Sequence, residues 1–258
     1  MKIALIGSGH IATFLGIELA KHEHIVQVIS PNEMHAAKLA EQLNCAYSNK
    51  LADLTHEADV YILAVKDDVL IELAQQINRP NALVIHTAGA VDLQVLSPMS
   101  TKLGSLWCFY SIQKEHLPSR KDIPLILQAN DAEGLKTIQY LANHVSTQTY
   151  VLNDEQKKWA HLAAVFANNF SNHLIDISQQ MMNKHQMPFE LIKPIIENTI
   201  EKLSYAKASD LQSGPAIRGD QQTIQKQLTM LQEQPLWQMI YQAISESIQH
   251  SRKNNYDL

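Results

Sequence analysis

Two glycines near the start of the chain have the spacing of a phosphate-binding turn. In the segment GSGHIA at positions 7–12, Gly7 permits a tight turn and Gly9 lets backbone N–H groups approach a phosphate. The helix that follows offers unpaired N–H groups and a partial positive charge to an anion. The pattern predicts a grip for a dinucleotide diphosphate, formed by Gly7, Ser8, Gly9, His10 and Ile11. The alternative is a turn that only joins a strand to a helix.

The segment after the second expected strand bears on which dinucleotide is bound. NAD-binding proteins place Asp or Glu there to accept hydrogen bonds from the ribose. This chain has Ser30, Pro31 and Asn32, without an acid and without the arginine that often binds a 2′-phosphate. We therefore expect NADP rather than NAD, with Ser30 and Asn32 as contacts. The backbone of Ala64 and Val65, at the end of a later strand, is a further expected cofactor contact.

A dinucleotide of this kind supplies hydride, so the protein must add orientation and a proton donor. His86 ends an expected strand at the same sheet edge as the glycine turn, and a histidine titrates near working pH. His86 is accordingly a candidate catalytic acid. The alternative is a strand-end histidine bonded to backbone.

Polar residues at helical spacing suggest a substrate site. His161, Asn168 and Asn172 are separated by seven and four residues, so one helix face would carry all three. Polar groups are costly to bury unless they are paired or line a cavity. We expect His161 and Asn168 to act in catalysis and Asn172 to bind substrate in a cleft between two domains. A solvated or dimer-facing stripe is the alternative.

The segment GPAIRGD at 214–220 has the composition of a turn followed by a helix capped by Asp220. Arg218 in this turn is a candidate clamp for a substrate carboxylate. Its alternative role is to pair with a carboxylate of the protein and fix the loop.

Two contrasting patterns along the chain define the elements that position these residues. Short apolar strands alternate with helical stretches over residues 1–152, which predicts a mostly parallel sheet covered on both faces. At Asn153 a capping pattern starts a helix that is expected to reach about residue 184, and prolines punctuate further helices. The predicted fold is an α/β dinucleotide-binding domain at 1–152 and an all-α substrate and dimerisation domain at 153–258. Strands are expected at 3–6, 25–30, 60–65, 82–87, 105–109, 125–129 and 149–152.

Composition excludes several classes of protein. The formal net charge is −5 and lysines and arginines are scattered, so no nucleic-acid partner is expected. The two cysteines do not form a Cys-x-x-Cys pair, and no metal-ligand motif occurs, so we predict neither a disulfide framework nor a metal. No apolar run is long enough to span a membrane, and the chain begins with its first strand, so a cytoplasmic protein is expected.

Five motifs together resemble a known family. They are the glycine turn, AVKDD at 64–68, HTAGA at 86–90, AAVFANNF at 163–170 and GPAIRGD at 214–220. In this order they resemble the Rossmann-type NADP oxidoreductases that carry a C-terminal helical domain of unknown function. These are distant relatives of pyrroline-5-carboxylate reductase and ketopantoate reductase, and their second domain is similar to the C-terminal domain of 6-phosphogluconate dehydrogenase. The resemblance implies the fold and NADP as cofactor, and it leaves the substrate open.

Two departures from related sequences support a rival hypothesis. The loop Trp107–Ser111 differs from the family pattern, and no lysine precedes the paired asparagines at the position used by hydroxyisobutyrate-type dehydrogenases. The main prediction is an NADP(H)-dependent oxidoreductase acting on a small carbonyl or imine, which forms a homodimer through its helical domain. The alternatives are a catalytically silent NADP-binding sensor and an interaction protein that uses the first domain only as a scaffold.

Overall fold

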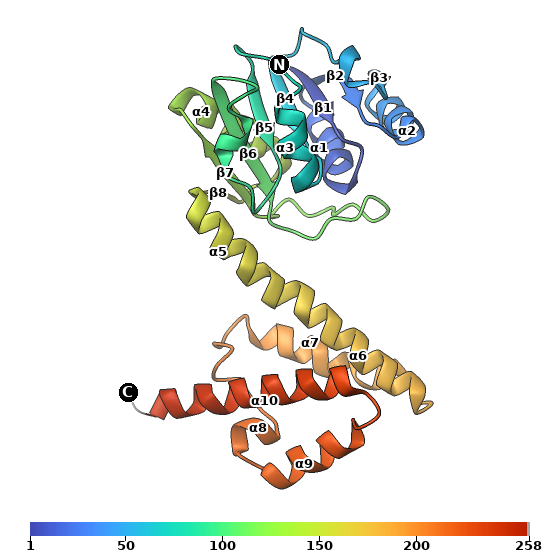
Figure 1. Ribbon diagram of the computed structural model, residues 1–258, viewed down its shortest axis with the longest axis vertical. Helices are drawn as coiled ribbons and strands as arrows, with labels where there is room; N and C mark the ends of the chain where they lie inside the picture. The colour runs from blue at the N-terminus through green and yellow to red at the C-terminus, as the bar shows by residue number, and fades with distance from the viewer. Residues whose placement is uncertain (257–258) are drawn as a thin grey trace. The chain divides into compact units, whose positions relative to one another are not determined.

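A single mixed sheet organises the first half of the chain in the computed structural model, which describes residues 1–256 and side chains to residue 251 (Figure 1). Its strand order is β3-β2-β1-β4-β5-β6-β7-β8, and only β6 and β7 pair antiparallel. The strands are β1 Lys2–Ile6, β2 His24–Ile29, β3 Ala46–Ser48, β4 Val60–Leu63, β5 Leu83–His86, β6 Lys102–Cys108, β7 Leu125–Ala129 and β8 Thr149–Val151. The predicted mostly parallel sheet is confirmed.

The glycine turn and the ends of β2, β4 and β5 lie at one edge of the sheet because these strands run parallel to β1. The register pairs Ile6 with Ile29 and Leu63, and it pairs Leu63 with His86. The carboxyl ends of four strands therefore meet at this edge, where open α/β sheets bind ligands.

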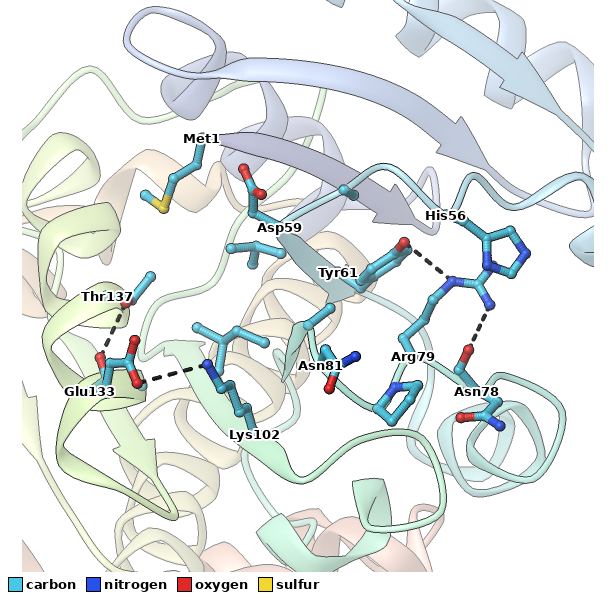
Figure 2. A pocket seen from close by; sticks show the side chains of 16 residues that line it. Met1, His56, Asp59, Tyr61, Asn78, Arg79, Asn81, Lys102, Glu133 and Thr137 are labelled. Carbon is cyan, nitrogen blue, oxygen red and sulfur yellow. Dashed lines mark hydrogen bonds and ion pairs between the residues drawn. The ribbon is translucent and has the colours of Figure 1, made fainter.

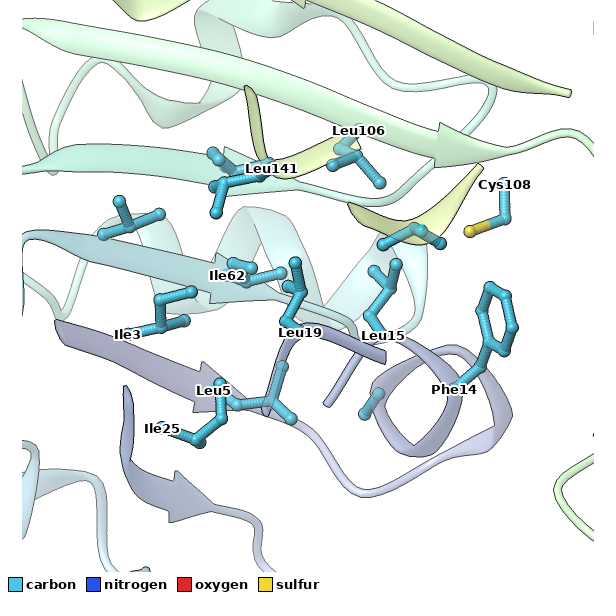
Figure 3. Packing of buried hydrophobic residues seen from close by; sticks show 14 of the residues in the cluster. Ile3, Leu5, Phe14, Leu15, Leu19, Ile25, Ile62, Leu106, Cys108 and Leu141 are labelled. Atoms are coloured by element: carbon cyan, nitrogen blue, oxygen red, sulfur yellow. The ribbon is translucent and has the colours of Figure 1, made fainter. Parts of the chain in front are cut away.

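Helices cover both faces of the sheet, as the near-continuous apolar strands require. On one face α1 (His10–Ala20), α2 (Glu33–Leu43) and α4 (Ala132–Val145) pack against the sheet, and Figure 3 shows part of this core, including Leu15, Leu19 and Leu141. On the other face lie α3 (Asp67–Ala74) and the 3-10 helix η2 (Leu93–Leu96). A further 3-10 turn, η1, spans Leu51–Asp53.

Contacts divide the chain into two compact units, Met1–Val165 and the part from Phe166 onward. Unit 1 contains the sheet and α5 (Asp154–Ala164). Unit 2 is helical and consists of α6 Ser171–Lys184, η4 Phe189–Leu191, α7 Lys193–Lys202, α8 Pro215–Arg218, α9 Gln221–Met230 and α10 Pro235–Tyr256, preceded by a π-helical segment. The division into these units concerns contacts alone, and the domain boundary expected at residue 152 stays a prediction.

Three local details differ from what the sequence analysis considered. The edge strand β3 was missed because it has only three residues, of which Ala46 and Tyr47 are exposed, so it lacks an apolar pattern. The helix that begins after Asn153 ends at Lys184, as expected, but its middle segment Val165–Phe170 is π-helical. A π turn holds more residues than an α turn, so the α-helical spacing that placed His161 on one face with Asn168 does not apply.

Candidate nucleotide-binding and catalytic site

The glycine turn has a backbone shape that only glycine adopts easily. Gly7 has φ +118° and donates its N–H to the Ile29 carbonyl at 2.8 Å. A Cβ atom at this position would lie 2.2 Å from the Ala64 carbonyl oxygen. Gly7 therefore packs β1 against the ends of β2 and β4, and its role is demanded by the fold as well as by any ligand.

Gly9 differs from Gly7, because no protein atom requires it. It is the N-cap of α1 in an extended conformation, it is exposed, and nothing lies within 4 Å of the Cβ atom that an alanine would add. The cap makes no side-chain hydrogen bond, so the first N–H groups of α1 have no capping side chain. A diphosphate fits this open space, where a Cβ atom would obstruct it.

The neighbouring residues of the predicted cofactor site lie at the same edge. The Ser8 and Ser30 hydroxyls are buried and 2.7 Å apart. Asn32 caps α2, since its side chain accepts a hydrogen bond from the His35 N–H at 3.0 Å. His10 is exposed, and its Nδ1 accepts from the Lys114 N–H at 3.0 Å. The Asn32 side chain therefore has a structural role, as the N-cap of α2, that does not depend on a ligand.

The end of β4 lies beside the turn. Ala64 and Val65 are half-buried, and Ala64 directly contacts Gly7 as described. Helix α3 begins at Asp67 with Lys66 as its N-cap residue. A cofactor role for the backbone of Ala64 and Val65 stays a prediction.

His86 is fully buried, at 0% exposure, and its Nδ1 accepts a hydrogen bond from the Ala88 N–H at 3.2 Å. Because Nδ1 is an acceptor, the neutral ring carries its proton on Nε2, which has no hydrogen-bond partner. Burial, and next the charge of Lys157, lower the pKa of His86 to about 3. His86 is therefore the strand-end histidine bonded to the backbone, which was the alternative to a catalytic acid. At neutral pH its imidazole ring is neutral and can donate a hydrogen bond through Nε2.

Lys157 is the residue that sequence reasoning missed. Its side chain is 1% exposed, and its Nζ donates to the Gln128 side-chain oxygen at 3.2 Å and to the Val91 carbonyl at 3.3 Å. Asp154 lies 3.7 Å away. Burial lowers the pKa of Lys157 despite this carboxylate. The only available signal was a lysine one turn before His161 on the same helix.

The cluster around Lys157 is polar and deeply buried. The sheet register pairs His86 with Ser105, and Ser105 with Gln128. The Ser105 hydroxyl is buried and has no hydrogen-bond partner, like Nε2 of His86. Unpaired buried groups are rare in native proteins and often mark functional positions. Lys157 thus covers a row of polar groups on the face of the sheet that carries α3.

His161 lies near this row, over the loop that follows β5. Its ring centroid is 5.9 Å from that of Trp107, and the Trp107 ring covers Gly89, where a Cβ atom would come 2.5 Å from the indole. Two regions singled out in the sequence, the segment Trp107–Ser111 and the predicted catalytic His161, are therefore in contact through Trp107, which belongs to β6. His161 itself is exposed, as a group that meets a substrate must be.

The remaining predicted residues belong to unit 2. Asn168 and Asn172 are exposed, and the Asn168 amide donates to the Asn169 side chain at 3.2 Å. Arg218 is exposed at the end of α8, and Asp220 caps α9 by accepting from the Thr223 N–H, as predicted. The substrate roles of these side chains stay predictions.

A hollow of about 500 Å³ lies at the edge of the sheet opposite the glycine turn (Figure 2). Its lining includes the first residues of β4, β5 and β6, and Arg79 there is bonded to Tyr61 and to the Leu54 carbonyl. None of the predicted site residues lines this hollow. Its position at the amino ends of the strands does not match ligand binding in open α/β sheets.

Among residues 1–256, no group of three or more His, Cys, Asp or Glu side chains is placed to hold a metal ion. Across the same part of the chain, no helix has the length and apolarity needed to cross a membrane.

Comparison with known protein families divides the chain much as the fold does. Residues 2–89 match the family described as NADP oxidoreductase, coenzyme F420-dependent, and residues 123–248 match a domain of unknown function, DUF2520. No curated protein matches the chain in sequence.

Solved structures with the same fold extend over nearly all of the chain. BF3122 of Bacteroides fragilis, a candidate NADP oxidoreductase, is 33% identical, with a TM-score of 0.90 over 96% of this chain and 98% of that one. Protein TM1727 of Thermotoga maritima is 21% identical, with a TM-score of 0.74 over 98% and 99%. An imine reductase of Myxococcus stipitatus, solved with NADP+, is 12% identical with a TM-score of 0.66 over 98% and 95%, which shows a shared fold.

Proposed function

The chain belongs to the NADP oxidoreductase family represented by BF3122, and on this premise we propose that it transfers hydride between NADP(H) and a small carbonyl or imine. The observation that carries the proposal is Gly9. A glycine that no neighbouring atom requires, at the open N-terminus of α1, is explained by a ligand that approaches the backbone.

The residues at the sheet edge suit each part of the cofactor. The turn from Gly7 to Ile11 would hold the diphosphate, Ser30 would contact the ribose, and the backbone of Ala64 and Val65 would contact the cofactor at the end of β4. NADPH supplies the hydride when it is bound. The protein's own contribution is to orient the nicotinamide ring and to exclude water. The Trp107 indole, which lies over Gly89, is well placed for this.

We assign proton transfer to His161. It is exposed, it belongs to α5 in unit 1, and it contacts the Trp107 ring beside the loop after β5. His86 is less suited to this role as an acid, because a pKa of about 3 leaves it neutral. His86 instead offers an N–H group as a hydrogen-bond donor. Asn168, Asn172 and Arg218 are the proposed substrate contacts supplied by unit 2.

A second copy of the chain is the proposed cover for unit 2. Among its described side chains only Ile177, Ala216, Ile224 and Ser245 are buried, which is too little for a stable core. Large apolar side chains such as Ile195 and Leu236 are exposed at 65% and 72%. Exposed apolar surface of this extent marks an interaction face, and closed symmetric dimers are the commonest assemblies.

The test of cofactor binding compares wild type with Gly9→Ala. Titration with NADPH, followed by protein fluorescence, should show saturable binding to wild type. Gly9→Ala should weaken it by at least about 100-fold because the methyl group takes the space of a phosphate. Urea unfolding should show equal stability for both. Equal affinity, or no binding to wild type, would overturn the proposal.

The test of catalysis measures the loss of NADPH absorbance against a panel of small aldehydes, ketones and cyclic imines. Asn168→Ala should abolish turnover of any active substrate while it leaves NADPH affinity unchanged. Unchanged turnover would remove Asn168 from the site. NADPH binding without turnover of any compound in the panel would contradict the enzymatic part of the proposal.

A further inference from the structure

A second, smaller hollow of about 240 Å³ opens beside the glycine turn. Its wall includes Ser8, which stands between the two glycines, and Thr13 of α1. The Ser8 hydroxyl is hydrogen-bonded to that of Ser30, the first residue after β2. The end of β2 is where the ribose 2′ substituent of a bound dinucleotide is recognised. The hollow therefore adjoins the place that distinguishes NADP from NAD.

Basic side chains from two separate elements line this hollow. His35 and Lys38 come from α2, and Lys114 comes from the connection between β6 and β7, some 75 residues later in the chain. Glu115 is the carboxylate among the lining residues. An arginine after β2, the usual partner of a 2′-phosphate, is absent.

The position of Lys114 is fixed by its backbone. Its N–H donates to Nδ1 of His10, the first residue of α1, at 3.0 Å. Glu115 lies 3.9 Å from the same nitrogen. Because Nδ1 accepts from Lys114, the neutral ring does not form an ion pair with Glu115 through that atom. This bond holds the β6–β7 connection against the glycine turn and leaves the Lys114 side chain free to reach an anion in the hollow.

We propose that Lys114, together with Lys38, is the specificity-determining contact for the 2′-phosphate of NADP(H). The inference rests on the proposed function, since it presumes that a dinucleotide lies on the glycine turn. Ser8, whose hydroxyl is bonded to that of Ser30, lines the hollow and offers a hydrogen bond, and the two ammonium groups neutralise the phosphate. Lys114 replaces, from a distant loop, the arginine that related folds place after β2.

The experiment measures dissociation constants for NADPH and NADH with wild type, Lys114→Gln, Lys38→Gln and the double variant. Lys121→Gln is the matched control, because Lys121 belongs to the same connection but pairs with Glu18 outside the hollow. Competition by 2′,5′-ADP and by 5′-AMP isolates the contribution of the phosphate. Unchanged urea midpoints establish that every variant folds.

Lys114→Gln should weaken NADPH and 2′,5′-ADP about tenfold or more, the double variant further, and NADH and 5′-AMP less than twofold. Lys121→Gln should change none of the four. If NADPH and NADH weaken equally, or if neither changes, the inference is wrong while the proposed function stands. If wild type binds neither dinucleotide, both fail.

Discussion

Gly7 packs directly against Ala64, so closely that a Cβ atom on residue 7 would be 2.2 Å from the Ala64 carbonyl oxygen. The φ of +118° adds a conformational penalty for any other residue. Gly7→Ala should therefore lower the free energy of unfolding by about 2 to 4 kcal/mol. Urea denaturation measures this, with Gly9→Ala as the control, which should change stability by less than about 1 kcal/mol. Equal midpoints for both variants would contradict the turn geometry.

His86 should make the protein sensitive to acid. Its pKa is lowered to about 3 by burial and by Lys157, whereas its ordinary value is 6.5. Between these two pH values the unfolded chain binds a proton that the folded protein does not. This contribution to stability is therefore complete above about pH 6.5 and is lost as the pH falls toward 3, by up to about 5 kcal/mol.

His86→Gln removes this titration and should flatten the dependence of stability on pH between 6.5 and 3. The matched control is His116→Gln, because His116 is exposed. The measurement is urea unfolding at a series of pH values. A slope that is the same for His86→Gln and wild type would show that His86 is not held neutral by the fold.

The two cysteines should react slowly in the folded protein. Burial raises the pKa of Cys108 to about 12 and that of Cys45 to about 11, so the reactive thiolate is scarce at neutral pH. Cys108 is fully enclosed in the core, while Cys45 is half-buried. Iodoacetamide labelling of the native protein, followed by mass spectrometry, should be slow and should modify Cys45 before Cys108. Both cysteines should react at an appreciable rate only after the protein is unfolded. Rapid labelling of native Cys108 would argue against the packing of β6.

His161 should matter for turnover and not for cofactor affinity. If it supplies the proton, His161→Gln lowers kcat by about 100-fold or more and leaves the NADPH dissociation constant within about twofold. Steady-state kinetics with any substrate found in the panel measures this. A variant with wild-type kcat would exclude His161 as the donor.

Unit 2 should hold two copies of the chain together. Sedimentation at micromolar concentration should show a dimer, and Ile195→Asp should shift it toward monomer because an exposed apolar side chain on α7 becomes charged. Ile71→Asp is the matched control, since Ile71 is 54% exposed but lies on α3 of unit 1. A wild-type monomer at this concentration would exclude the proposed dimer.

The sequence by itself determined the parts of the protein that depend on local patterns. Gly7 and Gly9, after a buried strand, predicted the turn, and the alternation of strands and helices predicted the parallel sheet, since main-chain periodicity and turn geometry are encoded by neighbouring residues. The capping box at Asn153 was read correctly for the same reason.

Only the tertiary structure decided which side chains lose contact with water and which distant segments meet. Lys157 has an ordinary surface-lysine context in the sequence, yet Val91 and Gln128, 66 and 29 residues away, bury it. Lys114 reaches the glycine turn through His10, 104 residues earlier in the chain. Such pairs share no local pattern, because their proximity is set by how the strands order themselves in the sheet.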